Sequence, residues 1–209
     1  MSIYIRKMSA GILTLMLCMF TIQAYAQVTS DEKGYYDDYK SILQVMKKSM
    51  KEAPKTGDPS LDFLNQMIPH HEAAVSMSEN IIKYSHNEAV KQLASNIIRE
   101  QLEGIRKMEV LKSKLEATPK VNKQAEASYL KAYNAIYQKM TTSMEDAQAT
   151  GNINKAYLQE MILHHEGAIE MARNILKFTQ NGELKTIAQN IINTQQKQVT
   201  EMKNLLKNM

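Results

Sequence analysis

The chain has 209 residues, a length that suits one compact domain or a fused duplication. Glycine (7) and proline (4) are scarce, tryptophan is absent and methionine (15) is abundant, a composition that favours an all-α protein. The formal net charge is only +4 at pH 7, so the composition gives no reason to expect a nucleic-acid partner.

The first 26 residues are predicted to be a secretory signal peptide. Basic residues at 6–7 precede an uncharged apolar run over 10–22, and Ala24-Tyr25-Ala26 provides a small-x-small cleavage site. An uncleaved anchor is the alternative, but the run is shorter than the ~20 residues that a membrane span needs. We therefore expect a periplasmic or secreted protein that begins at Gln27 and has no stable membrane insertion. Cys18, the only cysteine, would leave with the signal.

The remaining chain shows helical periodicity in three consecutive stretches. Apolar residues recur at i, i+3, i+4 and i+7 over 30–53, from about 60 to 84, and from about 87 to 115. Only Ser85-His86-Asn87 separates the last two stretches, which predicts antiparallel neighbours. The polar residues 116–128 are predicted to form a linker.

The second half of the chain repeats the first. Residues 129–205 align with residues 35–111 at an offset of 94 residues, without a gap. One helical hairpin cannot bury both of its faces, whereas two copies packed together can. We therefore expect the repeats at 30–115 and 129–207 to form one bundle. It would have four core helices, with one extra helix before each hairpin.

Each repeat carries a double histidine bracketed by methionines. Residues 65–77 read NQMIPHHEAAVSM, and residues 159–171 read QEMILHHEGAIEM. At about 100° per residue, both histidines and both methionines of one copy occupy about one third of the helix circumference. Nitrogen and soft sulfur donors on one face indicate a metal site. The candidate ligands are Met67, His70, His71, Met77 and Met108 in the first half, and Met161, His164, His165, Met171 and Met202 in the second.

The following helix of each hairpin adds a buried-face glutamine, Gln101 or Gln195, seven residues before its methionine. These amides could orient a histidine ligand or simply bond to backbone. Ten of the eleven methionines after residue 26 form pairs across the repeat, whereas leucines change freely, as Leu93 does to Ile187. Core filling is the alternative reading of methionine. Further thioether sites are predicted at Met46, Met50, Met140 and Met144.

Thioether and imidazole together suit Cu(I) and its analogue Ag(I), whereas iron sites prefer carboxylates beside histidine. The acidic residues at 100 and 103 become Thr194 and Lys197 in the second copy, which argues against a di-iron site. We therefore expect a copper-binding protein without catalytic residues, whose His-dependent binding weakens as the pH falls through about 6.5. A ferritin-like di-metal redox enzyme and a metal-free helical interaction module remain alternatives. The sequence indicates no protein partner.

At these residues the chain resembles the domain of unknown function family numbered 305. That family has a Met-Ile-Pro-His-His stretch followed by small residues and a methionine, and then a helix with Gln and Met. Residues 67–77 match in full, and in residues 161–171 a leucine replaces the proline. The resemblance covers about 61–115 and 155–207. It implies a ferritin-like four-helix bundle in exported bacterial proteins, some of which, the CopM-type periplasmic proteins, are linked to copper binding and tolerance.

Overall fold

The computed structural model describes residues 30–147 and 151–209. The expected signal peptide, its cleavage site and Cys18 lie outside these residues. The described residues form helices joined by short loops, and they contain no strand. None of these helices is both long enough and apolar enough to span a membrane. The N-terminal helix covers residues 30–52, and it is followed by α2 (Pro59–Tyr84), α3 (Glu88–Ala117), α4 (Lys123–Glu145), α5 (Ile153–Ile175) and α6 (Gly182–Lys207).

The helix starts follow from local sequence. Asp58 caps α2 by accepting a hydrogen bond from the backbone N–H of Ser60, and Pro59 occupies the first turn, where its missing N–H costs nothing. Gly57 directly precedes the cap of α2, and Gly151 directly precedes the cap of α5. Their φ angles are 85° and 66°, a backbone conformation that is unfavourable for residues with a Cβ atom. Asparagines cap the other four labelled helices: Asn87, Asn122, Asn152 and Asn181.

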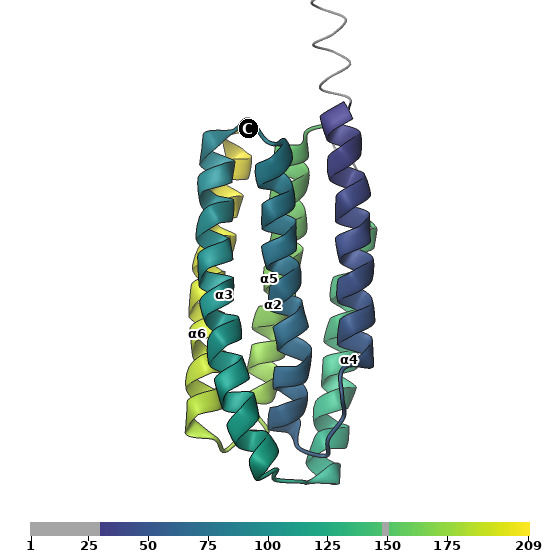
Figure 1. Cartoon of the computed structure of the whole chain (residues 1–209), viewed down its shortest axis with the longest axis vertical. Helices are drawn as coiled ribbons and strands as arrows, with labels where there is room; N and C mark the ends of the chain where they lie inside the picture. The colour runs from purple at the N-terminus through teal and green to yellow at the C-terminus, as the bar shows by residue number, and fades with distance from the viewer. Residues whose placement is uncertain (1–29, 148–150) are drawn as a thin grey trace, which may run out of the picture.

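The helices pack as three pairs (Figure 1). The pair of α2 and α5 lies in the middle, with α3 and α6 on one side and the N-terminal helix and α4 on the other. Because neighbours cover α2 and α5 on both sides, these helices are buried over most of their circumference. The double-histidine motifs lie on α2 and α5, so this arrangement places both motifs at the centre of the molecule. The all-α, ferritin-like bundle expected from the sequence is confirmed.

Contacts at equivalent positions relate the two halves. The side-chain amide of Asn80 donates to the carbonyl oxygen of Tyr35 at 3.0 Å, and that of Asn174 donates to the carbonyl oxygen of Tyr129 at 3.1 Å. The second pair lies 94 residues after the first. Each bond ties the central layer to the outer layer, so the extra helix of each repeat is an integral part of the bundle.

The connection between the halves is shorter than the linker expected over residues 116–128. Helix α3 continues to Ala117, and α4 begins at Lys123, because the side chain of Asn122 accepts a hydrogen bond from the backbone N–H of Ala125. Residues 123–128 appeared to be a linker because this first part of α4 is largely exposed and therefore polar.

Candidate metal centre

His70 and His164 meet at the centre of the bundle. Their ring centroids are 3.7 Å apart, with 36° between the ring planes, and both residues are 0% exposed. Nε2 of His164 lies 3.1 Å from the carbonyl oxygen of His70. A carbonyl oxygen only accepts hydrogen bonds, so this nitrogen carries the proton. The lone pair of His164 is therefore on Nδ1, which forms no hydrogen bond within the described part of the chain.

The neighbouring His165 is held through a chain of hydrogen bonds. Its Nε2–H donates to Oε1 of Gln198 at 2.8 Å, and Nε2 of Gln198 donates to a carboxylate oxygen of Glu100 at 3.0 Å. These two hydrogen bonds link the buried ring of His165 to the exposed carboxylate of Glu100 on α3. They fix the proton of His165 on Nε2 and leave the lone pair on Nδ1, which has no hydrogen-bond partner among the described residues.

The first half lacks this chain of hydrogen bonds. Gly104 stands at the position equivalent to Gln198, and Thr194 at the position equivalent to Glu100. Gly104 lies directly against the ring of His71: a Cβ added there would be 3.0 Å from Cδ2 and 3.2 Å from Nε2. The two histidine pairs share a sequence pattern but differ in what surrounds their ring nitrogens.

Several buried polar atoms at the centre lack a hydrogen bond within the described residues. They include both ring nitrogens of His70 and the side-chain oxygens of Gln101 and Gln195. Leaving such a group unsatisfied costs about 1–3 kcal/mol, and native proteins do so rarely. Unpaired lone pairs on nitrogen and oxygen are what a bound cation would satisfy, so the residues present fit a metal ion.

Burial keeps the histidines neutral. It lowers the pKa of His71 to about 3 and that of His165 to about 4, and the charge of a protonated His165 would lower the pKa of His71 further. The pKa values of His70 and His164 lie well below 6.5, again chiefly because of burial. A neutral imidazole keeps the lone pair that a metal needs. Protonation of these imidazoles therefore begins at a lower pH than the 6.5 expected from the sequence.

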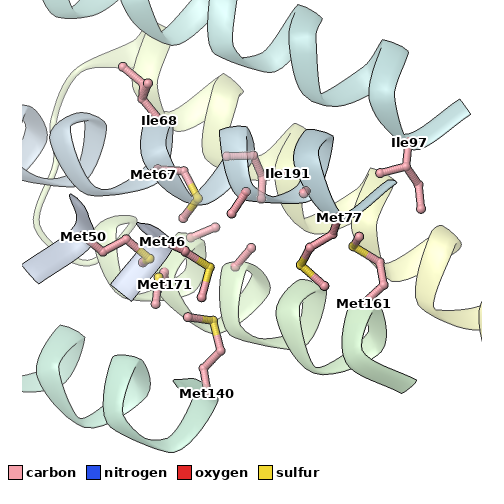
Figure 2. Packing of buried hydrophobic residues seen from close by; sticks show 14 of the residues in the cluster. Met46, Met50, Met67, Ile68, Met77, Ile97, Met140, Met161, Met171 and Ile191 are labelled. Atoms are coloured by element: carbon pink, nitrogen blue, oxygen red, sulfur yellow. The ribbon is translucent and has the colours of Figure 1, made fainter. Parts of the chain in front are cut away.

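The methionines expected as ligands are all buried in the same core cluster. Figure 2 shows the side chains of Met46, Met50, Met67, Met140 and Met171 pointing toward one another, with Met77 beside Met161. Thus four helices supply the first group, including the N-terminal helix and α4. The remaining candidates, Met108, Met144 and Met202, are buried in this core as well.

The four histidines do not form one ion site. Within residues 30–147 and 151–209, no three side chains of His, Cys, Asp or Glu are placed where they could hold one ion together. The structure brings His70 and His164 together, and it directs His71 and His165 toward opposite hairpin partners, Gly104 on α3 and Gln198 on α6.

Glu160, which directly precedes Met161, carries a buried carboxyl group that the sequence pattern did not predict. The Tyr35 hydroxyl donates to Oε2 of Glu160 at 2.5 Å, and in the other half the Tyr129 hydroxyl donates to Oε1 of Gln66 at 2.6 Å. Burial raises the pKa of Glu160 to about 7, although the hydrogen bond from Tyr35 opposes this rise. The available signal was the change from Gln66 to Glu160 inside an otherwise repeated motif.

Similar architecture occurs in solved structures. CopM in its Ag-bound form is 26% identical over 71% of this chain and 95% of that chain, with a TM-score of 0.53. CopM in the Cu(I)-bound form gives the same identity and score over 71% and 96%. A DUF305 fragment from Deinococcus radiodurans, 24% identical with a TM-score of 0.53, covers 75% of this chain and 99% of that chain and supports the fold.

One curated relative matches over a short stretch. Uncharacterized protein L153 from Acanthamoeba polyphaga mimivirus is 44% identical over 46 residues, which make up 22% of this chain and 30% of the viral protein. The chain therefore spans less than a third of that relative. A family model described as "Domain of unknown function (DUF305)" matches residues 60–206, a segment that includes both double-histidine motifs. The chain belongs to the DUF305 family.

Proposed function

We propose that this protein is exported and binds Cu(I), and by the same chemistry Ag(I), through histidine and methionine side chains. Its role would be to sequester or deliver copper in the periplasm, without catalysing a reaction. Metal binding by this chain goes beyond the family assignment, and it is supported by the donor atoms at the centre of the bundle.

The observation that carries the proposal is the set of buried imidazole nitrogens without hydrogen bonds beside buried thioethers. Among the described residues, His70 has two such nitrogens, and His71, His164 and His165 each have one, on Nδ1. Imidazole and thioether are a donor set suited to Cu(I), and a thioether binds the ion without losing a proton. The motif methionines Met67, Met77, Met161 and Met171 are buried in the core formed by the helices that carry the histidines.

The comparisons support the same chemistry. Structures of CopM exist in Ag-bound, Cu(I)-bound and Cu(II)-bound forms, at 25–26% identity to this chain. The duplicated motif lies within the segment that matches the family. A pocket selective for soft ions would bind Cu(I) and Ag(I) in competition, because both prefer sulfur and imidazole donors.

The test is a competition titration of the chain from Gln27 to Met209 with a chromogenic Cu(I) chelator, under anaerobic, reducing conditions. We expect the protein to withdraw Cu(I) from the chelator and Ag(I) to displace it. In parallel, Fe(II) is added in air while oxygen is monitored, and we expect no catalysed uptake. Failure to retain Cu(I) would favour a metal-free interaction module, and rapid iron-dependent oxygen uptake would favour a ferritin-like redox enzyme.

A further inference from the structure

The two repeats differ at the ring nitrogen that faces the outer helix pair. In the second half, Gln198 lies beside this nitrogen, and its Oε1 accepts a hydrogen bond from Nε2 of His165 at 2.8 Å. In the first half the equivalent residue is Gly104, which has no side chain to reach His71. A glycine within a helix costs about 1 kcal/mol relative to alanine, so its place in α3 calls for a local reason. That reason is the space that it leaves beside the imidazole.

A cleft of about 410 Å³ opens between α3 and α6 at this point. Its lining offers nitrogen, sulfur and oxygen donors: His71, Met108, Gln101 and Gln195. Gln101 and Gln195 are 3% and 2% exposed, and their Oε1 atoms form no hydrogen bond among the described residues. Unpartnered amide oxygens from two helices therefore lie beside an imidazole and a thioether at the base of an open cleft.

The equivalent position in the other half is filled. There Gln198 is buried and extends between His165 and Glu100, so its amide closes the approach to the imidazole. Glu100 itself lines the cleft of the first half. Two halves that are otherwise built alike therefore differ at one position. A hydrogen-bonded glutamine covers the imidazole of His165, whereas a glycine leaves the imidazole of His71 uncovered.

We propose that this cleft is the route by which the soft monovalent cation enters, and that His71 and Met108 form the first site that it occupies. Gln101 and Gln195 would supply amide oxygens as the ion loses its water. Gly104 keeps this route open, whereas Gln198 closes the corresponding route to His165. This inference rests on the proposed function, because it assigns an entrance and a filling order to the same Cu(I) and Ag(I) cargo.

The mouth of the cleft carries both signs of charge. Arg99 and Lys107 line it together with Glu100 and Glu103, and Glu103 forms an ion pair with Lys107 at 3.3 Å. The mouth therefore provides no strong field that would favour a particular charge. The choice among metal ions is therefore made by the soft and neutral donors at the base of the cleft. These donors suit Cu(I) and Ag(I) better than Mg²⁺ or Ca²⁺.

The first test measures access to His71 without metal. The apo protein is treated with diethyl pyrocarbonate, which acylates neutral imidazole, and the modified histidines are identified by mass spectrometry. His86, whose side chain is 92% exposed, reports full reactivity, and the fully buried His164 reports protection. We expect His71 to react clearly faster than His164. In Gly104→Gln, His71 should fall to the level of His164, because the new amide can cover Nε2 as Gln198 covers its own histidine.

The second test follows loading with Ag(I) and Cu(I) by stopped flow. The parent should load in a fast and a slow phase, Gly104→Gln should lose the fast phase, and the matched variant Gln198→Gly should gain fast loading and a reactive His165. Gln198→Gly also serves if Gly104→Gln fails to fold, as judged by circular dichroism.

Equal protection of His71 and His164 in the folded parent would overturn the proposed entrance. If all three proteins bind the metal and load it with identical kinetics, the proposed entrance is wrong but the proposed function still stands. No binding of either metal would instead remove the proposed function, and the inference with it.

Discussion

The imidazole rings of His70 and His164 lie 3.7 Å apart at the centre of the bundle, and the Nε2–H of His164 donates to the carbonyl oxygen of His70. Equivalent residues of the two repeats thus touch each other, as is expected near a pseudo-two-fold axis. The contact joins the two motifs into one buried unit with free ring nitrogens. The stability of the protein, and the Cu(I) affinity proposed for it, should both depend on this unit.

Acid should destabilise the apo protein. In the unfolded chain each histidine titrates near pH 6.5, whereas the folded protein holds the pKa of His71 at about 3 and that of His165 at about 4. Below pH 6.5 the unfolded chain binds protons that the folded chain does not, so the free energy of unfolding falls. Each buried histidine contributes about 1.4 kcal/mol per pH unit to this slope. Glu160, with its raised pKa, opposes part of it.

Urea unfolding curves from pH 7.5 to pH 4.5 measure this effect. Replacing the exposed His86 by glutamine, the residue that the second repeat has there, is the matched control for the loss of one histidine. A free energy of unfolding that stays constant over this range would show that the histidines are not buried as described.

Glu160→Gln should stabilise the protein above pH 7. Burial raises the pKa of this carboxyl from 4.5 to about 7, so its stabilising contribution is complete below pH 4.5 and is lost as the pH rises through 7. The variant avoids the ionisation and copies Gln66. We expect a gain of up to about 3 kcal/mol at pH 8 and less than about 1 kcal/mol near pH 5. The reciprocal variant Gln66→Glu should lose stability at pH 8, and thermal unfolding at both pH values compares the three proteins.

Removing the two tyrosine hydroxyls should have unequal effects. Tyr35 donates to the buried Glu160 carboxyl group, whereas Tyr129 donates to the neutral amide of Gln66. A hydrogen bond to a charged group contributes about 1.5–3 kcal/mol, and one between neutral groups about 1 kcal/mol. Tyr35→Phe should therefore lower the free energy of unfolding more than Tyr129→Phe does at pH 8, and the two losses should converge near pH 5. Equal costs at pH 8 would mean that Glu160 is protonated there.

Met67→Leu combined with Met77→Leu should weaken Cu(I) binding while the fold persists. Leucine is close to methionine in volume, so each exchange usually costs less than about 1.5 kcal/mol of stability. Met209→Leu, at the exposed C-terminal residue that has no partner in the repeat, is the control. Competition with a Cu(I) chelator provides the comparison, and Met161→Leu with Met171→Leu should act alike in the second half. Binding equal to that of the parent would identify these methionines as core filling.

Much of this architecture was accessible from sequence because it depends on local periodicity. The spacing of Met67, His70 and Met77 predicts one shared helix face, and the structure buries all three. The 94-residue repeat also predicts two matching hairpins in one bundle. The polar segment 116–128 was misread in part, because an exposed first turn of a helix and a loop have similar composition. The cap formed by Asn122 distinguishes them.

The sequence by itself determined which residues form helices, which faces are apolar, and that the two halves match, because helical period and duplication are written in residue order. Tertiary structure decided which histidine nitrogen is free and which side chain covers it. Gly104 and Gln198 are visible as a mismatch in the repeat, but only the packing of α3 against α2 and of α6 against α5 places them at the rings of His71 and His165. The lowered histidine pKa values have the same origin, since burial at the centre of three helix layers comes from contacts between residues far apart in the chain.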